Sequence, residues 1–129
     1  MKLAYVLIIA LVCLAAQTAA QSERQRVQDL VKECQKESGS TVNEIENIRN
    51  GVITADTGKQ ALCVNRKLGV LDQNGDLIAD KFKQHVDALT DKNDLREEFH
   101  NKCGKTEGEN PEAKTIKFVK CMQSVLAKV

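Results

Sequence analysis

Residues 59–76 read KQALCVNRKLGVLDQNGD, and this stretch divides at Gly69. The first part has apolar residues at the spacing of one helix face, so it predicts a helix that begins near Asp56 or Thr57 and ends at Gly69. The part that follows is rich in turn-forming residues and predicts a loop. The apolar positions of the predicted helix are Ala61, Leu62, Val64 and Leu68.

The loop from Asp72 to Asp76 has the composition of a calcium site but not its spacing. An EF-hand loop needs glycine at its sixth position and glutamate at its twelfth. Counted from Asp72, Gly75 falls at the fourth position and Lys83 at the twelfth. The spacing therefore favours an ordinary turn, and no metal site is predicted.

Two short helices are predicted before this stretch. Ser22 with Gln25, and Thr41 with Glu44, have the spacing of capping boxes, in which the first side chain caps a helix N-terminus. A glycine follows each helix and is expected to end it. The apolar stripes are Val27, Leu30, Val31 and Cys34 in the first helix, and Val42, Ile45 and Ile48 in the second.

Three more helices are predicted after the loop. Asp91 or Asn93 is expected to cap the second of them, and Asn110 with Pro111 is a strong start for the last. The last has apolar residues on more than one side, as expected for a helix packed between others. The apolar faces are Ile78, Phe82, Val86 and Leu89, then Leu95, Phe99 and Cys103, then Ile116, Phe118, Val119, Cys121, Met122, Val125 and Leu126. Six short helices and no convincing strand predict an all-α bundle.

The N-terminal segment has the layout of a secretory signal peptide. Lys2 precedes an unbroken apolar run from Leu3 to Ala16, and small residues follow where a signal peptidase cuts. The run is well short of the roughly 20 apolar residues that cross a bilayer. We therefore predict a cleaved signal, residues 1–20, followed by one secreted, extracellular domain, residues 21–129.

The charge balance excludes several kinds of partner. The chain has 19 Lys and Arg residues and 18 Asp and Glu residues. Removal of the signal takes away Lys2 and no acidic residue, so the secreted form is expected to have equal numbers of each. A balanced chain has no broad electrostatic attraction for nucleic acid or an anionic membrane. Neither nucleic-acid binding nor membrane insertion is predicted.

Cysteine use predicts a disulfide framework. Cys13 leaves with the signal, and an even number in a secreted chain predicts two disulfides. Four cysteines allow three pairings, and the sequence alone does not choose among them. No pair has the spacing of a zinc or redox motif, so no metal, cofactor or catalytic thiol is predicted. The four are Cys34, Cys63, Cys103 and Cys121.

The two histidines give no catalytic arrangement. His85 lies on the apolar stripe of its helix, and the simpler interpretation is a boundary residue that is hydrogen-bonded or solvated. The alternative is a pH switch, because histidine changes charge between roughly pH 5 and 8. The simpler interpretation applies more strongly to His100, which lies off the apolar row. No Ser-His-Asp or paired-carboxylate arrangement stands out, and the chain is not predicted to be an enzyme.

The length, signal, helices and cysteine spacing together resemble those of the insect odorant-binding proteins, the PBP/GOBP-like family. That family usually has six cysteines, and its second and fifth would fall at Lys59 and Glu112 of this chain. These two are bridge partners in the family, so their joint absence resembles the four-cysteine, or "minus-C", subgroup. We expect Lys59 and Glu112 to form a weak surface ion pair instead.

The resemblance implies the pairs Cys34–Cys63 and Cys103–Cys121, and an apolar cavity enclosed by the helices. It implies a secreted carrier of small hydrophobic ligands, such as odorants, pheromones or similar semiochemicals, in sensillum lymph or another extracellular fluid. Any contact with an odorant receptor would be indirect, and the carrier would be a monomer or a weak dimer. The alternative is a non-olfactory interaction or lipid-carrier protein of venom, seminal fluid or haemolymph.

Seven residues are candidates for the cavity wall because they lie on the apolar faces of three helices. Plain core packing predicts the same pattern, so the sequence is equally compatible with both interpretations. Met122 suits a wall because its flexible side chain adapts to varied shapes. The candidates are Phe82, Val86, Leu89, Phe99, Phe118, Met122 and Leu126.

Overall fold

The computed structural model describes residues 2–129, with side chains described from Ala19 onward. In these residues it has six helices and, apart from a single bridge of Leu71 with Leu77, no strand pairing. The predicted all-α architecture is therefore confirmed. The predicted signal peptide lies almost wholly outside the residues whose side chains are described. The helices are α1 (Lys2–Ser38), α2 (Glu44–Arg49), α3 (Ala55–Leu68), α4 (Ala79–Leu89), α5 (Asn93–Cys103) and α6 (Pro111–Leu126).

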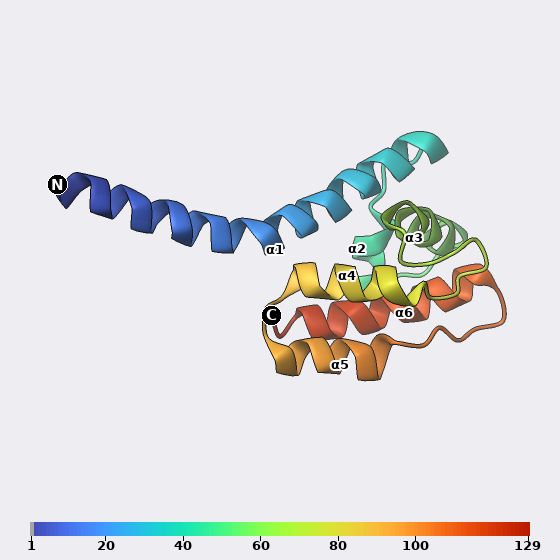
Figure 1. The fold of residues 1–129 in the computed structure, drawn as a ribbon. Coiled ribbons are helices and arrows are strands. Elements are labelled where there is room, and N and C mark those ends of the chain that lie inside the picture. Colours follow the sequence, from blue (N-terminus) through green and yellow to red (C-terminus); the bar gives the residue numbers. More distant parts are fainter. Residues whose placement is uncertain (1) are drawn as a thin grey trace.

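The helices form two groups, α1, α2 and α3 in one and α4, α5 and α6 in the other, and α6 lies centrally between them. In Figure 1, α4, α5 and α6 extend across the view, whereas α3 is seen nearly end-on. Helix α6 contacts α2, α3 and α5, which agrees with its many-sided apolar surface. Helix α1 packs against both α3 and α4, so it links the two groups.

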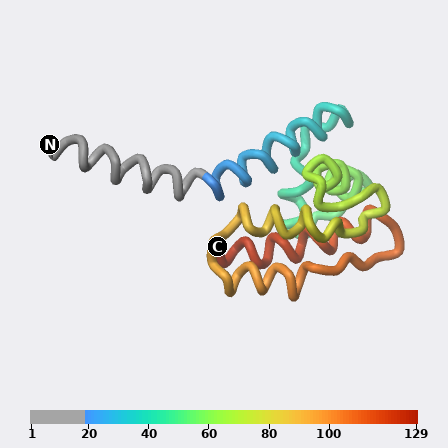
Figure 2. Tube along the Cα trace, in the orientation of Figure 1, coloured from blue at the N-terminus to red at the C-terminus, as the bar shows by residue number. Residues whose placement is uncertain are grey.

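The C-terminal end of the chain returns to the connection between α4 and α5. Figure 2 shows this end, in red, beside the loop between the yellow and orange helices. Lys128 forms an ion pair there with Glu98 of α5, and Glu98 also pairs with Lys102 (2.7 Å). These contacts fasten the last residues against the bundle.

Local sequence signals correctly predict the C-terminal end of α3 and the start of α6, and α3 begins at Ala55, just before the predicted start near Asp56 or Thr57. Helix α3 begins at a capping box in which Thr54 is the N-cap and Thr57 the reciprocal partner, and it ends at Gly69. Gly69 has a positive φ of 83°, a conformation that glycine adopts without strain. Asn110 caps α6 by accepting a hydrogen bond from the backbone N–H of Ala113 (2.8 Å).

The predicted capping box at Ser22 and Gln25 is wrong. Helix α1 continues through Ser22, because Ala19 and the residues after it are already helical. An N-cap residue needs non-helical backbone, which Ser22 does not have. The side chain of Gln25 instead donates a hydrogen bond to Asp29 one turn further along (2.9 Å).

Two other predicted caps are also wrong. Asn43, not Thr41, caps α2, since its side chain accepts a hydrogen bond from a backbone N–H in the first turn (3.1 Å). In α5 the N-cap position falls on Lys92, which makes no side-chain cap bond, so neither Asp91 nor Asn93 caps the helix. The sequence offers several capping residues in a row at each place, so local composition does not single out the boundary.

The loop from Asp72 to Asp76 is a turn, as predicted. The Asp72 carboxylate accepts hydrogen bonds from the backbone N–H groups of Asn74 (2.8 Å) and Asp76 (3.0 Å). Gly75 has a positive φ of 76°, and a Cβ at this position would lie 2.8 Å from a backbone oxygen at the start of α6. Asp76 also pairs with Lys114 (2.7 Å). The turn is therefore docked on α6 by its own acidic and glycine residues.

Candidate functional site

Two disulfides fasten pairs of helices. Cys34 of α1 is bonded to Cys63 of α3, and Cys103 at the end of α5 is bonded to Cys121 of α6. This is the pairing that the family resemblance implies. The Cα atoms are 6.1 Å apart in the first bridge and 5.7 Å apart in the second. One bridge joins α1 to α3 and the other joins α5 to α6.

The seven candidate wall residues lie together in the centre of the bundle. Six of them belong to one set of buried, contacting side chains, which we name the apolar cluster, and Leu126 packs against it. Helices α2 to α6 and the segment after α3 all contribute to the set. The apolar cluster comprises Ile48, Ala61, Leu68, Val70, Leu71, Phe82, Val86, Leu89, Phe99, Cys103, Phe118, Val119, Met122 and Val125.

Three phenylalanines occupy this cluster. The ring of Phe82 meets the ring of Phe118 edge-on, with centroids 5.8 Å apart, and both side chains are buried. Phe82 also makes an edge contact with the ring of His100 (5.1 Å). Phe99 is fully buried. Edge-to-face rings add stabilisation beyond the area that they bury, so the phenylalanines contribute strongly to this cluster.

Val70 and Leu71 are members of the cluster that the sequence analysis did not find. They follow Gly69 directly, and both are almost fully buried. Their backbone N–H groups donate to the carbonyl oxygen of Asn65, which turns the chain back onto the bundle. The sequence did contain a signal for these residues. Two consecutive apolar residues after a helix-ending glycine favour a turn that brings the chain back to the core.

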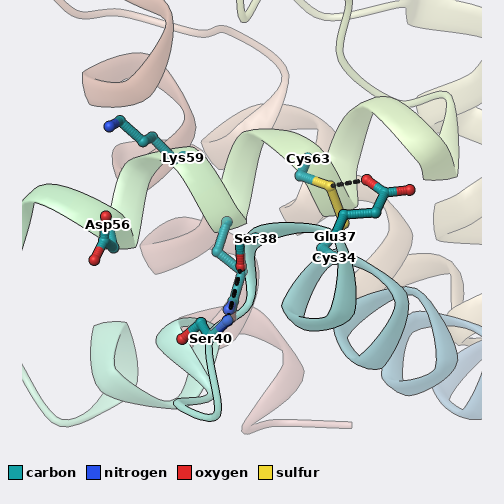
Figure 3. A pocket seen from close by; sticks show the side chains of 8 residues that line it. Cys34, Glu37, Ser38, Ser40, Asp56, Lys59 and Cys63 are labelled. Carbon is teal, nitrogen blue, oxygen red and sulfur yellow. Dashed lines mark hydrogen bonds between the residues drawn. A yellow bond between two sulfur atoms is a disulfide. The ribbon is translucent and has the colours of Figure 1, made fainter.

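The first described pocket lies outside the cluster, at the bridge between α1 and α3. It has a volume of about 300 Å³ and contains none of the seven wall candidates. Figure 3 shows Cys34 and Cys63 joined at its side, with the carboxylate of Glu37 reaching 3.8 Å from the Cys63 sulfur. Asp56 and Lys59 complete a charged rim. Charged side chains thus lie at the rim of a pocket whose exposed lining is mostly apolar.

The expected ion pair between Lys59 and Glu112 is absent, although the structure describes both side chains. Lys59 lines the first pocket. Glu112 instead packs against Gly58, where an added Cβ would lie 2.5 Å from the Glu112 Cβ. Helices α3 and α6 therefore approach closely at a glycine, at the place where the larger family would have a disulfide. A glycine inside a helix was the available signal for such an approach.

A buried polar network holds α2 on α3 beside the same place. The Glu44 carboxylate, 5% exposed, accepts hydrogen bonds from the Thr57 hydroxyl (2.8 Å) and from Asn47 (3.3 Å). The side-chain oxygen of Gln60 accepts a hydrogen bond from the Glu44 backbone N–H (2.7 Å), and its amide donates to the carbonyl of Val42 (3.0 Å). A buried carboxylate needs such donors, so these bonds fix the position of α2.

His85 is buried and hydrogen-bonded, not solvated. Its Nδ1 atom lies 2.7 Å from the Oε1 atom of Glu23, which joins α4 to α1. Burial lowers the pKa of His85 below its ordinary value of 6.5, and the hydrogen bond to Glu23 opposes part of that change. A second described pocket, of about 320 Å³, includes this pair. His100 is exposed, as its position off the apolar row predicts.

No group of three or more His, Cys, Asp or Glu side chains is placed to hold a metal ion among the residues described. None of the helices, over the same residues, combines the length and apolar character needed to cross a bilayer.

Comparisons with known proteins identify relatives. A sequence profile of the PBP/GOBP family matches residues 16–125. The B2 protein of Tenebrio molitor is 28% identical over 110 residues, which cover 84% of this chain and 85% of that protein. The B1 protein of the same beetle is 27% identical over 110 residues, which cover 84% of each.

The fold also matches a solved structure. The odorant-binding protein dmelOBP28a from Drosophila melanogaster aligns with a TM-score of 0.62 over 84% of this chain and 96% of that chain. The two sequences are 15% identical, so this likeness concerns the fold. The profile match, by contrast, spans most of the sequence. The chain therefore belongs to the PBP/GOBP family, the family of the insect odorant-binding proteins.

Proposed function

We propose that the protein is a secreted carrier that binds small hydrophobic ligands, such as odorants, pheromones or similar semiochemicals, within the apolar cluster. The observation that carries this proposal is the assembly of apolar side chains from five helices into one buried set, in a chain of this family. Ligand pockets are mostly apolar with few polar groups, and the composition of the cluster fits that description.

The proposed binding energy comes from removing apolar ligand surface from water. The cluster side chains pack against one another, so a ligand would enter by displacing side-chain contacts. Met122 suits this exchange because a flexible thioether can repack around varied shapes. An affinity near micromolar, roughly −8 kcal/mol, would allow reversible carriage.

The proposed setting is sensillum lymph or another extracellular fluid. Disulfides persist in oxidising compartments, and the two bridges of this structure fit secretion. The balanced charge gives no reason to expect nucleic acid or an anionic membrane as a partner. We propose a monomer or weak dimer whose contact with a receptor, if any, is indirect.

Displacement of a fluorescent apolar probe, N-phenyl-1-naphthylamine, tests the carrier function. The oxidised protein should bind the probe, and long-chain alcohols, esters or terpenoids should displace it at micromolar concentration. Absence of displacement by every apolar compound in the panel would overturn the proposal. If the protein binds no apolar compound but does bind a protein partner, the alternative of a secreted interaction protein is favoured.

A matched pair of variants tests whether the ligand lies in the apolar cluster. Val86→Ala removes two methyl groups from a fully buried position, whereas Val42→Ala makes the same change at an exposed position. Val86→Ala should change the affinity for large ligands severalfold, and Val42→Ala should leave it unchanged. Equal affinities in both variants, with helix content preserved by circular dichroism, would place the ligand outside the cluster.

A further inference from the structure

The second pocket differs in chemistry from the apolar cluster. It lies where α1, the end of α3 and α4 meet, and its volume is about 320 Å³. Its lining is dominated by polar and charged side chains, and none of the seven candidate wall residues takes part. Six polar and charged residues of the lining decide what the pocket could bind: Glu23, Arg26, Lys67, Lys81, Gln84 and His85.

The two buried polar residues of this pocket, Glu23 and His85, present hydrogen-bond acceptors that are not used within the protein. Glu23 and His85 are each 9% exposed, and they are joined through Glu23 Oε1 and His85 Nδ1 (2.7 Å). Arg26 donates to the same Oε1 atom (3.3 Å). Neither Glu23 Oε2 nor His85 Nε2 has a hydrogen-bond partner among the described residues, and neither atom is sealed from solvent. Both atoms are therefore accessible to a ligand.

The Glu23–His85 bond fixes which ring nitrogen accepts. An ionised carboxylate can only accept hydrogen bonds, so the proton of this bond belongs to His85 Nδ1. A buried imidazole favours the neutral form, which leaves Nε2 as an acceptor. The pair thus offers two acceptor atoms and no donor to a molecule in the pocket.

The rim of the pocket carries donors. Arg26 is partly engaged, since it also donates to the carbonyl oxygen of Leu68 (3.1 Å), and Lys67 pairs with two acidic residues of α1. Lys81 and Gln84 are exposed and make no side-chain hydrogen bond within the part of the chain that the structure describes. Three cationic side chains on the rim disfavour an ammonium ligand, and the buried carboxylate disfavours an anion.

We propose that this pocket is a binding site for a neutral hydroxyl group, which donates to Glu23 Oε2 or His85 Nε2 and accepts from Lys81 or Gln84. The hydroxyl belongs either to the polar end of an apolar ligand or to a small free polyol. In the first form the inference rests on the proposed carrier function, because the tail of that ligand needs the apolar cluster. In the second form the site is independent of it.

Three probes separate these forms: 1-decanol, methyl nonyl ether and glycerol. The alcohol and the ether have similar size, but only the alcohol can donate a hydrogen bond. The measurements are displacement of N-phenyl-1-naphthylamine and the NMR signals of the histidine rings. The chain has two histidines, so His100→Gln assigns the His85 ring without altering the pocket.

A hydroxyl site predicts that 1-decanol binds about tenfold more tightly than the ether, the effect of one hydrogen bond to a charged or buried partner. It also predicts that 1-decanol shifts the His85 ring signals and that methyl nonyl ether does not. A saturable shift with glycerol alone supports the free-polyol form. Equal affinity of alcohol and ether, with no shift of His85 by any probe, overturns the site while leaving the carrier function standing. If neither long-chain probe binds and glycerol shifts nothing, both proposals fail.

Variants provide the matched control. Glu23→Gln should reduce the preference for the alcohol over the ether severalfold, because it removes one of the two acceptors, and Asp29→Asn makes the same chemical change on the exposed face of α1 and should preserve the preference. Gln84→Ala should reduce the preference by severalfold without disturbing the Glu23–His85 bond. If both Glu23→Gln and Gln84→Ala keep the full preference for the alcohol over the ether, the assignment is contradicted.

Discussion

Two halves of the molecule are held together by different interactions. The first half is built from α4, α5 and α6, and the second half is built from α1, α2 and α3. The first half contains all three phenylalanines of the chain, and they meet in one buried group. The second half contains a buried carboxylate and a buried amide that hydrogen-bond across helices, those of Glu44 and Gln60. A disulfide lies in each half.

This difference shows how each half is specified. Apolar burial is non-directional and tolerates small shifts, so a stripe of apolar residues is enough to assemble α4, α5 and α6. A buried carboxylate requires donors at defined distances, so α2 can occupy only one position on α3. Thr57 and Gln60, which provide those bonds, lie on either side of Lys59, where the larger family would have a cysteine.

The largest expected effect comes from breaking the aromatic half. Phe82→Ala should lower the free energy of unfolding by about 3–5 kcal/mol, because it removes a buried ring and leaves a cavity. Denaturant unfolding followed by circular dichroism measures this change. Val52→Ala, at a position 48% exposed, is the control and should cost less than about 0.5 kcal/mol. A similar cost for both variants would show that the rings do not dominate this half.

Removal of either disulfide should have the next largest effect. The double variants Cys34→Ser/Cys63→Ser and Cys103→Ser/Cys121→Ser should each lower the free energy of unfolding by about 3 kcal/mol. The first bridge joins residues 29 apart and the second joins residues 18 apart, so chain entropy predicts a slightly larger loss for the first. Unfolding in denaturant compares the two variants. A much smaller loss for the first pair would mean that the other contacts of α1 with α3, among them the buried Val31 and Val64, hold these helices without the bridge.

A smaller effect is expected from the polar network. Thr57→Val should cost about 2 kcal/mol, since it removes a donor from the buried Glu44 carboxylate and an acceptor from the Thr54 backbone N–H. Thr115→Val is the matched control, because the hydroxyl of Thr115 is equally buried but bonds only to a carbonyl of its own helix. Thermal unfolding of the two variants at equal pH measures the difference. Equal melting temperatures would contradict a positioning role for the network.

The smallest expected effect is a dependence of stability on pH through His85. Burial lowers the pKa of His85 in the folded chain, whereas the unfolded chain binds a proton near pH 6.5. The contribution of neutral His85 is therefore fully present above about pH 6.5 and is lost as the pH falls from there toward the lowered folded pKa. Glu23 and Arg26 are the charged groups that modify this titration.

His85→Gln should flatten the stability profile over that pH range, and His100→Gln should leave it unchanged. Denaturant unfolding between about pH 7 and pH 5 checks both variants. A profile of equal slope in the wild type and in His85→Gln would assign the acid sensitivity to other groups.

The predicted parts of the fold and site share one physical origin. Helix faces, the stop at Gly69 and the cap at Asn110 follow from local backbone and side-chain preferences within a few residues. The seven wall candidates were found because apolar periodicity marks the buried face of a helix. The prediction at Ser22 failed because α1 continues through that residue, and the prediction at Thr41 failed because Asn43, another capping residue, takes the N-cap position.

The sequence by itself determined an all-α chain with four cysteines available for two bridges, because those properties depend on residue type and spacing. Only the tertiary structure decided that α3 and α6 touch at Gly58 and Glu112 rather than through Lys59. It alone brought Glu23 to His85, residues 62 positions apart, and placed polar groups around them. The physical reason is that contacts between distant helices depend on how all of the helices pack together, which no local pattern contains.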